Sequence, residues 1–375
     1  MFRNVALVIS SEELQNWSGG LSYYINLLNI LKKLQKTNLH IYTDSSSFIK
    51  NLNINKSCFV KELRCLRKGN IFFYLRKLII LLFKKDYILY CILLSDKINI
   101  LSHRRLFKNK NIKSIGWIPD LQQKFLKKFF QHDTLVAREK YVAKEIKNSD
   151  YIFVSSFQVK KEFKKFYNLN NTIIPLRISS SFISNSKKTN SNNSLKKFIL
   201  FPSQFWKHKN HDYLIQVAKK IKKYNIKIKI FFCGKIFDNR NIDYYEKLNK
   251  KIKKNKLNNV ITNYGEVSRK KLDFLQRSCL AFVNPSYYEG WSTINEESRA
   301  RNKYIFLSNI QGHKEQNNPG GIYFNNSDPM DFIRKLKQFL KKKKFLKRKK
   351  LIKKNNFFIS KLNIEALNVL DKIYK

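Results

Sequence analysis

Residues 280–308 read LAFVNPSYYEGWSTINEESRARNKYIFLS, and this stretch decides the fold class. An apolar run at 280–284 ends at Pro285, a helix is expected from 294 to 301, and a second apolar run follows at 304–308. Two buried strands joined by a helix form the repeating unit of a parallel sheet, because parallel strands need a long crossover connection. The stretch therefore predicts an α/β fold.

The same alternation continues along the rest of the chain. In the second half, strands are also expected at 198–202, 226–233 and 260–263, with helices at 211–224, 243–256 and 269–278. In the first half, strands are expected at 5–10, 40–43, 87–93, 112–118 and 151–155, with helices at 21–34, 70–85, 133–148 and 158–167. Two doubly wound units of this kind place a cleft between domains and bind ligands at the carboxyl ends of their strands.

A change of composition predicts where one domain ends. Residues 179–197 read SSSFISNSKKTNSNNSLKK, where Ser, Asn and Lys replace nearly all apolar residues, as is typical of a linker. With 375 residues and 43% hydrophobic side chains, the chain can bury two cores. We expect an N-terminal Rossmann-like domain over 1–180, a linker over 181–197, a second Rossmann-like domain over 198–350, and a basic helical tail over 351–375.

The chain is strongly basic, with 76 Lys and Arg against 26 Asp and Glu and a formal charge of +50. One interpretation is compositional drift of the surface. The other is attraction to polyanions such as lipid headgroups, lipid-linked phosphates or nucleic acid. The segment 70–85 combines basic and very apolar residues, and it is either a buried helix of its domain or a helix lying on a membrane surface.

Cysteine spacing and the length of the apolar runs argue against metalloproteins, disulfide-rich proteins and membrane-spanning proteins. The five cysteines show no C-x-x-C spacing and no paired spacing with His, which argues against a metal site and a disulfide framework. The apolar runs at 78–83 and 87–94 fall well short of the ~18–20 residues that span a bilayer, and the first apolar run is too short for a signal peptide. We expect a cytoplasmic protein with no transmembrane helix and no metal cofactor.

Two carboxylates stand out in the deciding stretch, Glu289 in the loop and Glu297 eight residues later in the helix. Two carboxylates that face one ligand suit a polyol, whose hydroxyl groups donate to them. The N–H groups near 290–294 lack helical partners and can bind an anion such as a diphosphate. The alternative is a surface helix that carries capping glutamates.

The deciding stretch resembles the Glu-x7-Glu signature of retaining glycosyltransferases of family four, which have the GT-B fold. Three further elements resemble a bacterial, mannosyltransferase-like branch of that family that serves polysaccharide biosynthesis: FPSQFWKHKNH at 201–211, LSNIQGHKEQ at 307–316 and GWIPDLQQ at 116–123. The sequence WSGG at 17–20 stands where the family carries its N-terminal glycine loop. The resemblance implies two Rossmann-like domains facing a central cleft.

The resemblance also implies a role for individual residues. Glu297 would hold the ribose hydroxyls of a nucleotide, Glu289 would lie beside the donor sugar, and Lys209 would neutralise the diphosphate, so that Glu289 and Lys209 are the catalytic candidates. The further donor-binding candidates are Gly290, Trp291, Ser292, Thr293, Gln204 and Gly234. The acceptor or phosphate loop candidates are Gly19, Gly20 and Asp120.

The implied activity is retaining transfer of a hexosyl group from a nucleotide-sugar to a glycan or lipid-linked glycan, in cell-surface polysaccharide or lipopolysaccharide synthesis. Partners would then include an anionic membrane surface, with peripheral attachment to the inner face of the plasma membrane. Gln123 stands where the branch has His, and Gln204 where many relatives have Arg, which keeps a non-catalytic GT-B binding protein open as an alternative. A nucleic-acid-binding protein is supported by charge alone, since no recognition motif is visible.

Overall fold

The computed structural model describes residues 3–52, 58–169, 172–180, 197–238, 240–341 and 348–375. The chain divides into two compact units. The first unit comprises Met1–Leu121, Val136–Ser179 and Lys361–Lys375, and the second comprises Gln122–Leu135 and Ser180–Ser360. The expected linker at 181–197 lies outside the described residues except for its last position.

The first unit contains a seven-stranded parallel sheet with the order β3-β2-β1-β4-β5-β6-β7. Its strands are β1 Arg3–Ile9, β2 Thr37–Thr43, β3 Phe59–Glu62, β4 Ile100–Ser102, β5 Lys113–Ile118, β6 Tyr151–Val154 and β7 Thr172–Pro175. The interior strand β1 pairs with β2 and β4, with Val5 opposite both Leu39 and Ile100. Residues 5–9 are all buried, because both faces of a parallel sheet are covered, and this explains the continuous apolar run.

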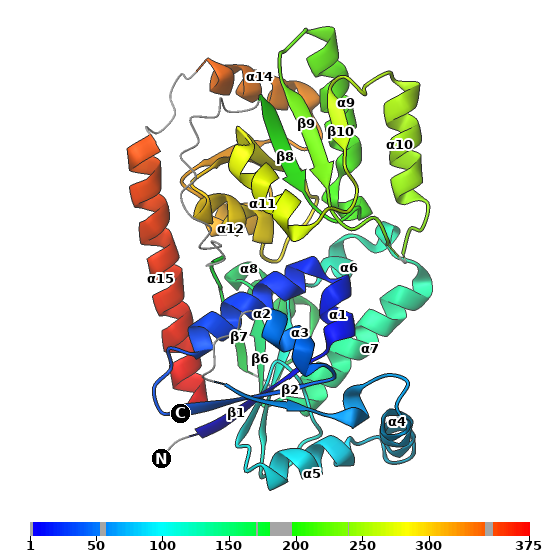
Figure 1. Cartoon of the computed structure of the whole chain (residues 1–375), viewed down its shortest axis with the longest axis vertical. Coiled ribbons are helices and arrows are strands. Elements are labelled where there is room, and N and C mark those ends of the chain that lie inside the picture. The colour runs from blue at the N-terminus through cyan, green and yellow to red at the C-terminus, as the bar shows by residue number, and fades with distance from the viewer. Residues whose placement is uncertain (1–2, 53–57, 170–171, 181–196, 239, 342–347) are drawn as a thin grey trace. The chain divides into compact units, whose positions relative to one another are not determined.

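The second unit contains a six-stranded parallel sheet with the order β10-β9-β8-β11-β12-β13. Its strands are β8 Phe198–Pro202, β9 Lys229–Cys233, β10 Ile261–Asn263, β11 Ala281–Asn284, β12 Tyr304–Ser308 and β13 Gly321–Phe324. The core around this sheet is rich in phenylalanine, and Figure 1 shows helices packed around both sheets. The expected α/β class with two doubly wound units is therefore confirmed.

The helices lie between the strands in chain order. In the first half they are α1 Ser11–Asn16, α2 Ser18–Leu31, α3 Ser46–Asn51, η1 Arg64–Leu66, α4 Ile71–Phe83, α5 Tyr87–Ser95, α6 Gln122–Phe125, η2 Lys127–Phe129, α7 His132–Asn148 and α8 Phe157–Phe166. In the second half they are η3 Lys207–Lys209, α9 His211–Lys223, α10 Tyr244–Lys254, α11 Arg269–Ser278, α12 Thr293–Ala300, α13 Gln311–Gln316, α14 Pro329–Leu340 and α15 Arg348–Tyr374. Side-chain caps start several of them, as when the hydroxyl of Ser156 accepts from the N–H of Val159 at the start of α8.

The strand expected at 87–93 is wrong, because this segment forms helix α5. The carboxylate of Asp86 accepts a hydrogen bond from the N–H of Leu89 and caps the helix. A short apolar run fits a buried strand and a buried helix equally well, so its composition could not decide between them. The fourth strand of the unit is instead β4.

At 17–20, where the resemblance implies a glycine loop, the chain instead starts a helix. Gly19 and Gly20 lie in the first turn of helix α2, after the short helix α1 that Ser10 caps. A side chain at position 20 would overlap the indole of Trp17. The glycine therefore serves close packing of an aromatic ring against the start of a helix, and not a change of chain direction.

Of the two interpretations of 70–85, the buried domain helix is excluded. Helix α4 forms as expected, but its one buried side chain is that of Arg76, and most of its large apolar side chains are exposed. Every helix within the described segments is too short or too polar to span a bilayer.

Candidate functional site

A cluster of buried polar residues in the second unit lies where the winding of its sheet reverses. The chain passes from β8 to β9 and β10 on one side, and then from β11 to β12 and β13 on the other. The loops after β8 and β11 therefore diverge at the carboxyl ends of two neighbouring strands. Ligands of doubly wound sheets bind at such a switch point.

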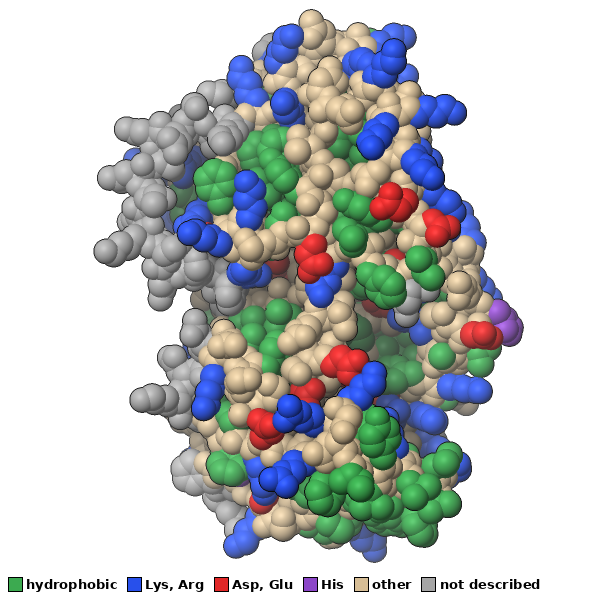
Figure 2. Space-filling view, turned by 45° about the vertical axis from the view of Figure 1, so that its right-hand side comes forward, with side chains coloured by type: hydrophobic (Ala, Val, Ile, Leu, Met, Phe, Trp, Pro, Cys, Tyr) green, Lys and Arg blue, Asp and Glu red, His purple; other side chains and the backbone are tan. Residues whose placement is uncertain are grey.

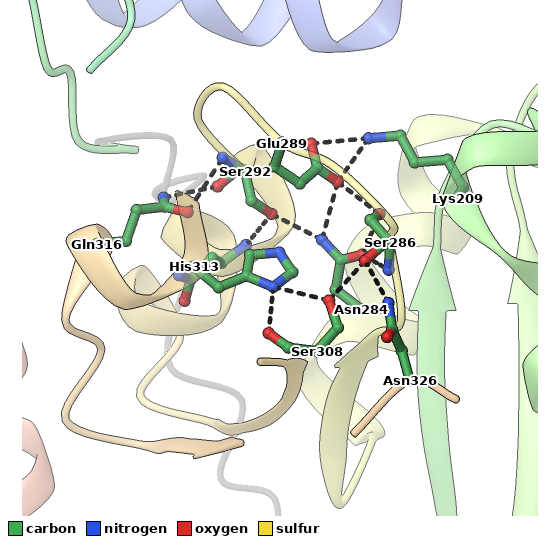
Figure 3. A network of polar contacts seen from close by, with 10 residues as sticks. Lys209, Asn284, Ser286, Glu289, Ser292, Ser308, His313, Gln316 and Asn326 are labelled. Carbon is green, nitrogen blue, oxygen red and sulfur yellow. Dashed lines mark hydrogen bonds and ion pairs between the residues drawn. The ribbon is translucent and has the colours of Figure 1, made fainter. Parts of the chain in front are cut away.

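Lys209 and Glu289 meet at this point, one from the segment after β8 and one from the loop after β11 (Figure 3). The Nζ atom of Lys209 lies 2.8 Å from Oε1 and 3.0 Å from Oε2 of Glu289. The amide of Asn284 and the hydroxyl of Ser286 donate to Oε1 at 3.2 Å and 2.7 Å. The Glu289 side chain is 8% exposed and that of Lys209 is 16% exposed. The site thus holds a buried carboxylate bound by one cation and two neutral donors.

Electrostatics keep this carboxylate ionised. Burial by itself would raise the pKa of Glu289, but the charge of Lys209, the nearby His313 and the hydrogen bonds from Lys209 and Ser286 together lower it below its ordinary value. His313 is buried, and burial lowers its pKa to about 4. Its Nδ1–H donates to the carbonyl of Ser308 at 3.0 Å, while its Nε2 has no hydrogen-bond partner among the described residues. A neutral imidazole therefore lies near the Lys209–Glu289 pair.

Helix α12 begins beside the pair, and its start is held by a ring of hydrogen bonds. The hydroxyl of Ser292 accepts from the N–H of Asn295 at 3.3 Å and from the amide of Asn284 at 2.9 Å. The backbone N–H and C=O of Ser292 bond the side-chain amide of Gln316 at 3.1 Å and 3.0 Å. Trp291 and Thr293 flank Ser292, and Gly290 comes directly before Trp291, so these hydrogen bonds hold the end of the expected donor loop at the start of α12.

Two glycines allow the loops of the site to approach closely. A side chain at position 312 would overlap the backbone carbonyl of Glu289, so α13 can lie against the loop only with glycine there. A side chain at Gly234, which has φ of +157°, would overlap the backbone of Ser203 and Gln204. The loops after β8 and β9 are thereby brought together, and Gln204 is buried between them.

Glu297 lies one turn further along α12 in a different environment. Its Oε2 accepts from the amide of Gln276 at 2.7 Å. Burial raises the pKa of its carboxyl, against the charges of Arg269 and Arg301. Arg301 is itself bound to Asp273 at 2.5 Å. Glu297 is therefore a carboxylate supported by arginines, which suits an acceptor of hydroxyl hydrogen bonds.

Sequence reasoning missed several residues that build these environments. They are Asn284, Ser286, Gln276, Arg269, Arg301 and the buried ion pair of Arg299 with Glu296. Asn284 and Ser286 flank Pro285 and read as turn formers. The others are spread over α11 and α12, and only the folded unit brings them to Glu297 or beneath the loop.

The candidate residues of the first unit lie around an ion pair and an aromatic cluster. Asp120 forms an ion pair with Arg138, at 3.0 Å. The rings of Trp17 and Tyr23 stack on Trp117 with centroid distances of 5.4 Å and 4.3 Å. The hydroxyl of Tyr23 is hydrogen-bonded to the buried His103 at 2.8 Å. Gly19 and Gly20 therefore begin a helix that carries an aromatic cluster.

No group of three or more His, Cys, Asp or Glu side chains in the described segments is arranged to hold a metal ion. The positive charge near Glu289 and Glu297 comes from Lys209, Arg269 and Arg301.

Comparison with known protein families finds a similarity in the second half of the chain. Residues 182–356 match the family described as "Glycosyl transferases group 1". Among curated proteins no sequence matches the chain.

Solved structures share the fold over the whole chain. HepE of Anabaena in complex with UDP and glucose has a TM-score of 0.71 at 11% identity, covering 99% of this chain and 100% of its own. Sucrose-phosphate synthase of Thermosynechococcus elongatus has a TM-score of 0.70 at 12% identity, covering 99% and 98%. A glycosyltransferase from Rickettsia africae ESF-5 has a TM-score of 0.64 at 15% identity, covering 100% and 98%. These likenesses show that the chain has the GT-B fold.

Proposed function

We propose that this protein is a retaining glycosyltransferase that moves a hexosyl group from a nucleotide-sugar to a glycan or lipid-linked glycan acceptor. The observation that carries the proposal is the buried Lys209–Glu289 pair at the switch point of the second sheet, inside the segment that matches the group 1 glycosyltransferases. HepE, which shares the fold, binds UDP-glucose. That supports a nucleotide-sugar as the donor class.

In the proposed reaction, the bond between the anomeric carbon of the donor sugar and the diphosphate oxygen breaks. The electron pair stays on the diphosphate, the acceptor hydroxyl oxygen forms the new bond to the anomeric carbon, and its proton is released. Lys209 stabilises the charge that develops on the leaving diphosphate, since a fixed cation costs no reorganisation during the reaction. The first-turn N–H groups of α12 add to this stabilisation.

Each remaining donor-site residue has a part in this proposal. Glu289, held by Lys209, Asn284 and Ser286, lies beside the donor sugar and orients its hydroxyls. Glu297 accepts hydrogen bonds from the ribose of the nucleotide. Gly290, Trp291, Ser292, Thr293, Gln204 and Gly234 shape the loops around the diphosphate and base.

We assign acceptor binding to the first unit, at Gly19, Gly20 and Asp120. The proposed setting is synthesis of cell-surface polysaccharide on the cytoplasmic side of the plasma membrane. No metal is part of the proposed reaction, because Lys209 and helix amides supply the positive charge.

A thermal-shift panel of GDP-, UDP-, ADP- and CMP-sugars tests donor binding first. A ligand at about 100 times its dissociation constant adds about 2.7 kcal/mol of apparent stability, so only the matching base should raise the melting temperature clearly. The selected donor is then incubated with the protein, and free nucleotide is measured with and without a glycan acceptor. Stabilisation with no release of nucleotide, in the presence of a panel of acceptors, would favour the non-catalytic binding protein. No stabilisation by any nucleotide-sugar would contradict the proposal.

A further inference from the structure

Helix α4 of the first unit turns its apolar side outward. Six large side chains on this side range from 46% exposed at Leu75 to 76% exposed at Ile71. The other four are Tyr74, Leu78, Leu81 and Leu82. They recur at intervals of three and four residues and so form one continuous stripe along the helix. A helix that served the core would bury this stripe.

The inward side of the same helix is polar at its centre. The guanidinium of Arg76 is 5% exposed and binds the carboxylate of Asp86, with its Nε 2.9 Å from Oδ1. Its Nη1 also donates to the backbone carbonyl of Cys65 at 3.5 Å. A buried ion pair therefore fixes α4 to the unit in the orientation that exposes the apolar stripe.

The core of the first unit is closed without α4. Helix α5 covers the sheet with Leu89 and Leu93, which are completely buried. The main packing partners of α4 are η1 and α5, and Figure 1 shows α4 at the outer edge of the unit. The stripe is thus additional apolar surface, larger than the scattered apolar residues of an ordinary protein surface.

Exposed lysines border the stripe. Lys77, Lys84 and Lys85 are all exposed, and the ammonium groups of Lys77 and Lys85 lie over the rings of Phe73 and Tyr87 at 5.4 Å and 5.9 Å. Figure 2 shows a broad hydrophobic patch with Lys and Arg side chains near its margin at the lower end of the first unit. Apolar residues bordered by lysine suit the boundary of an anionic bilayer, where acyl chains and phosphate headgroups meet.

We propose that α4 lies in the plane of an anionic membrane, with its apolar stripe among the acyl chains and its lysines at the lipid phosphates. A second copy of the chain fits less well, because self-association through this face would bring the lysines of two copies together. The helix has 13 residues, too few to cross the hydrocarbon layer, so the attachment is interfacial. The inference rests on the first unit alone and does not depend on the proposed transferase activity.

Vesicle flotation of the full chain in about 150 mM salt tests the proposal, since salt screens attraction that comes only from net charge. Wild type should float with vesicles containing phosphatidylglycerol and only weakly with phosphatidylcholine alone. The variant Leu78→Gln/Leu81→Gln/Leu82→Gln should lose roughly 100-fold or more in partition coefficient. Lys77→Gln/Lys84→Gln/Lys85→Gln should lose about 100-fold on anionic vesicles, at roughly five-fold per lysine, and little on neutral ones.

A matched control distinguishes binding through α4 from non-specific binding of exposed apolar side chains to vesicles. Three large apolar side chains outside α4 have exposed fractions similar to those of the three leucines. They are Ile242, Phe357 and Ile364, which are 71%, 63% and 55% exposed. Their triple change to Gln should leave flotation unchanged. All of the substituted side chains are exposed, so thermal unfolding of the variants should match that of wild type, which confirms that they are folded.

Insertion of α4 among the acyl chains can be measured directly by fluorescence. The variant Leu78→Trp should gain fluorescence quenching by brominated lipids beyond that of wild type, whose four tryptophans lie outside α4. Equal flotation of wild type and the leucine variant, or no added quenching, would overturn the proposal. A dimer in the absence of lipid that the leucine variant converts to a monomer would also overturn it, in favour of a second copy as the occupant.

Discussion

Replacing Lys209 with methionine removes the cation that binds Glu289 and keeps an unbranched side chain that is one atom shorter. Glu289 would retain its hydrogen bonds from Asn284 and Ser286 but would lose its ion pair. Breaking a buried pair by removing one partner costs about 3–5 kcal/mol, and the partial exposure of Lys209 places this case near about 3 kcal/mol. The control is Lys207→Met, which removes an exposed lysine two residues earlier in η3.

The pH dependence gives this prediction its sharpest form. In the wild type, the lowered pKa of Glu289 stabilises the fold above the unfolded value near 4.5, and this stabilisation is lost as the pH falls through the folded value. In Lys209→Met, burial dominates and raises the pKa of Glu289, so the ionised carboxylate destabilises the fold at neutral pH. The difference in unfolding free energy between the two proteins should be full at pH 7. It should shrink as the pH falls below the ordinary glutamate value near 4.5, and close once the pH is below the lowered pKa of Glu289 in the wild type.

Urea unfolding at a series of pH values measures this difference. The double variant Lys209→Met/Glu289→Gln should recover much of the stability, because no unpaired charge is then left in the site. If Lys209→Met is no less stable than Lys207→Met, or if its deficit is the same at pH 4 and pH 7, then Lys209 does not hold an ionised, buried Glu289.

The donor site can be tested in four further ways. Glu297→Gln keeps an acceptor for Gln276 but loses the charge, so UDP or the selected nucleotide should bind about 10-fold more weakly or worse by calorimetry, on the scale of a charge-assisted hydrogen bond; unchanged affinity would remove Glu297 from the site. Burial raises the pKa of Glu297, so as the pH is lowered its carboxylate should become protonated earlier than an ordinary glutamate. The affinity of the wild type for the nucleotide should therefore begin to fall at a higher pH, and Glu297→Gln should not show this fall. Gly312→Ala must displace the backbone of Glu289, which should cost about 1–3 kcal/mol in thermal unfolding and reduce sugar transfer more than donor binding; a stable, fully active variant would show that the two loops move apart freely. Sugar transfer should persist in EDTA, and loss of activity that Mg²⁺ restores would show that Lys209 and the helix amides are not sufficient.

Local sequence patterns predicted secondary structure correctly where only one type of element fits the pattern. The apolar runs at 198–202 and 304–308 form strands β8 and β12 with the expected bounds, because buried parallel strands must be apolar on both faces. The expected helix 269–278 is α11, which the hydroxyl of Ser268 caps. The prediction for 87–93 was wrong because its apolar residues fit either a strand or a helix. The helix is selected by the cap from Asp86 and by the packing around it.

For the site, the sequence determined the residue types and their order along the chain. The resemblance pointed to glycines, two glutamates and a lysine. These residues could be placed near the ends of expected strands, because strands and their connections are recognisable from local sequence. That Lys209 binds Glu289 was decided by the tertiary structure, since the two are 80 residues apart and meet only when β8 and β11 become neighbours. The support of Glu297 by residues of α11 has the same cause.

The apolar helix shows the same division most clearly. The sequence by itself determined that 71–83 would be helical, apolar and bordered by lysine. It left open which side would face the unit, because apolar residues occur on nearly every side of the helix. The tertiary structure decided this through one ion pair: Arg76 needs Asp86, and once that pair is buried, the leucines on the opposite side must point to solvent.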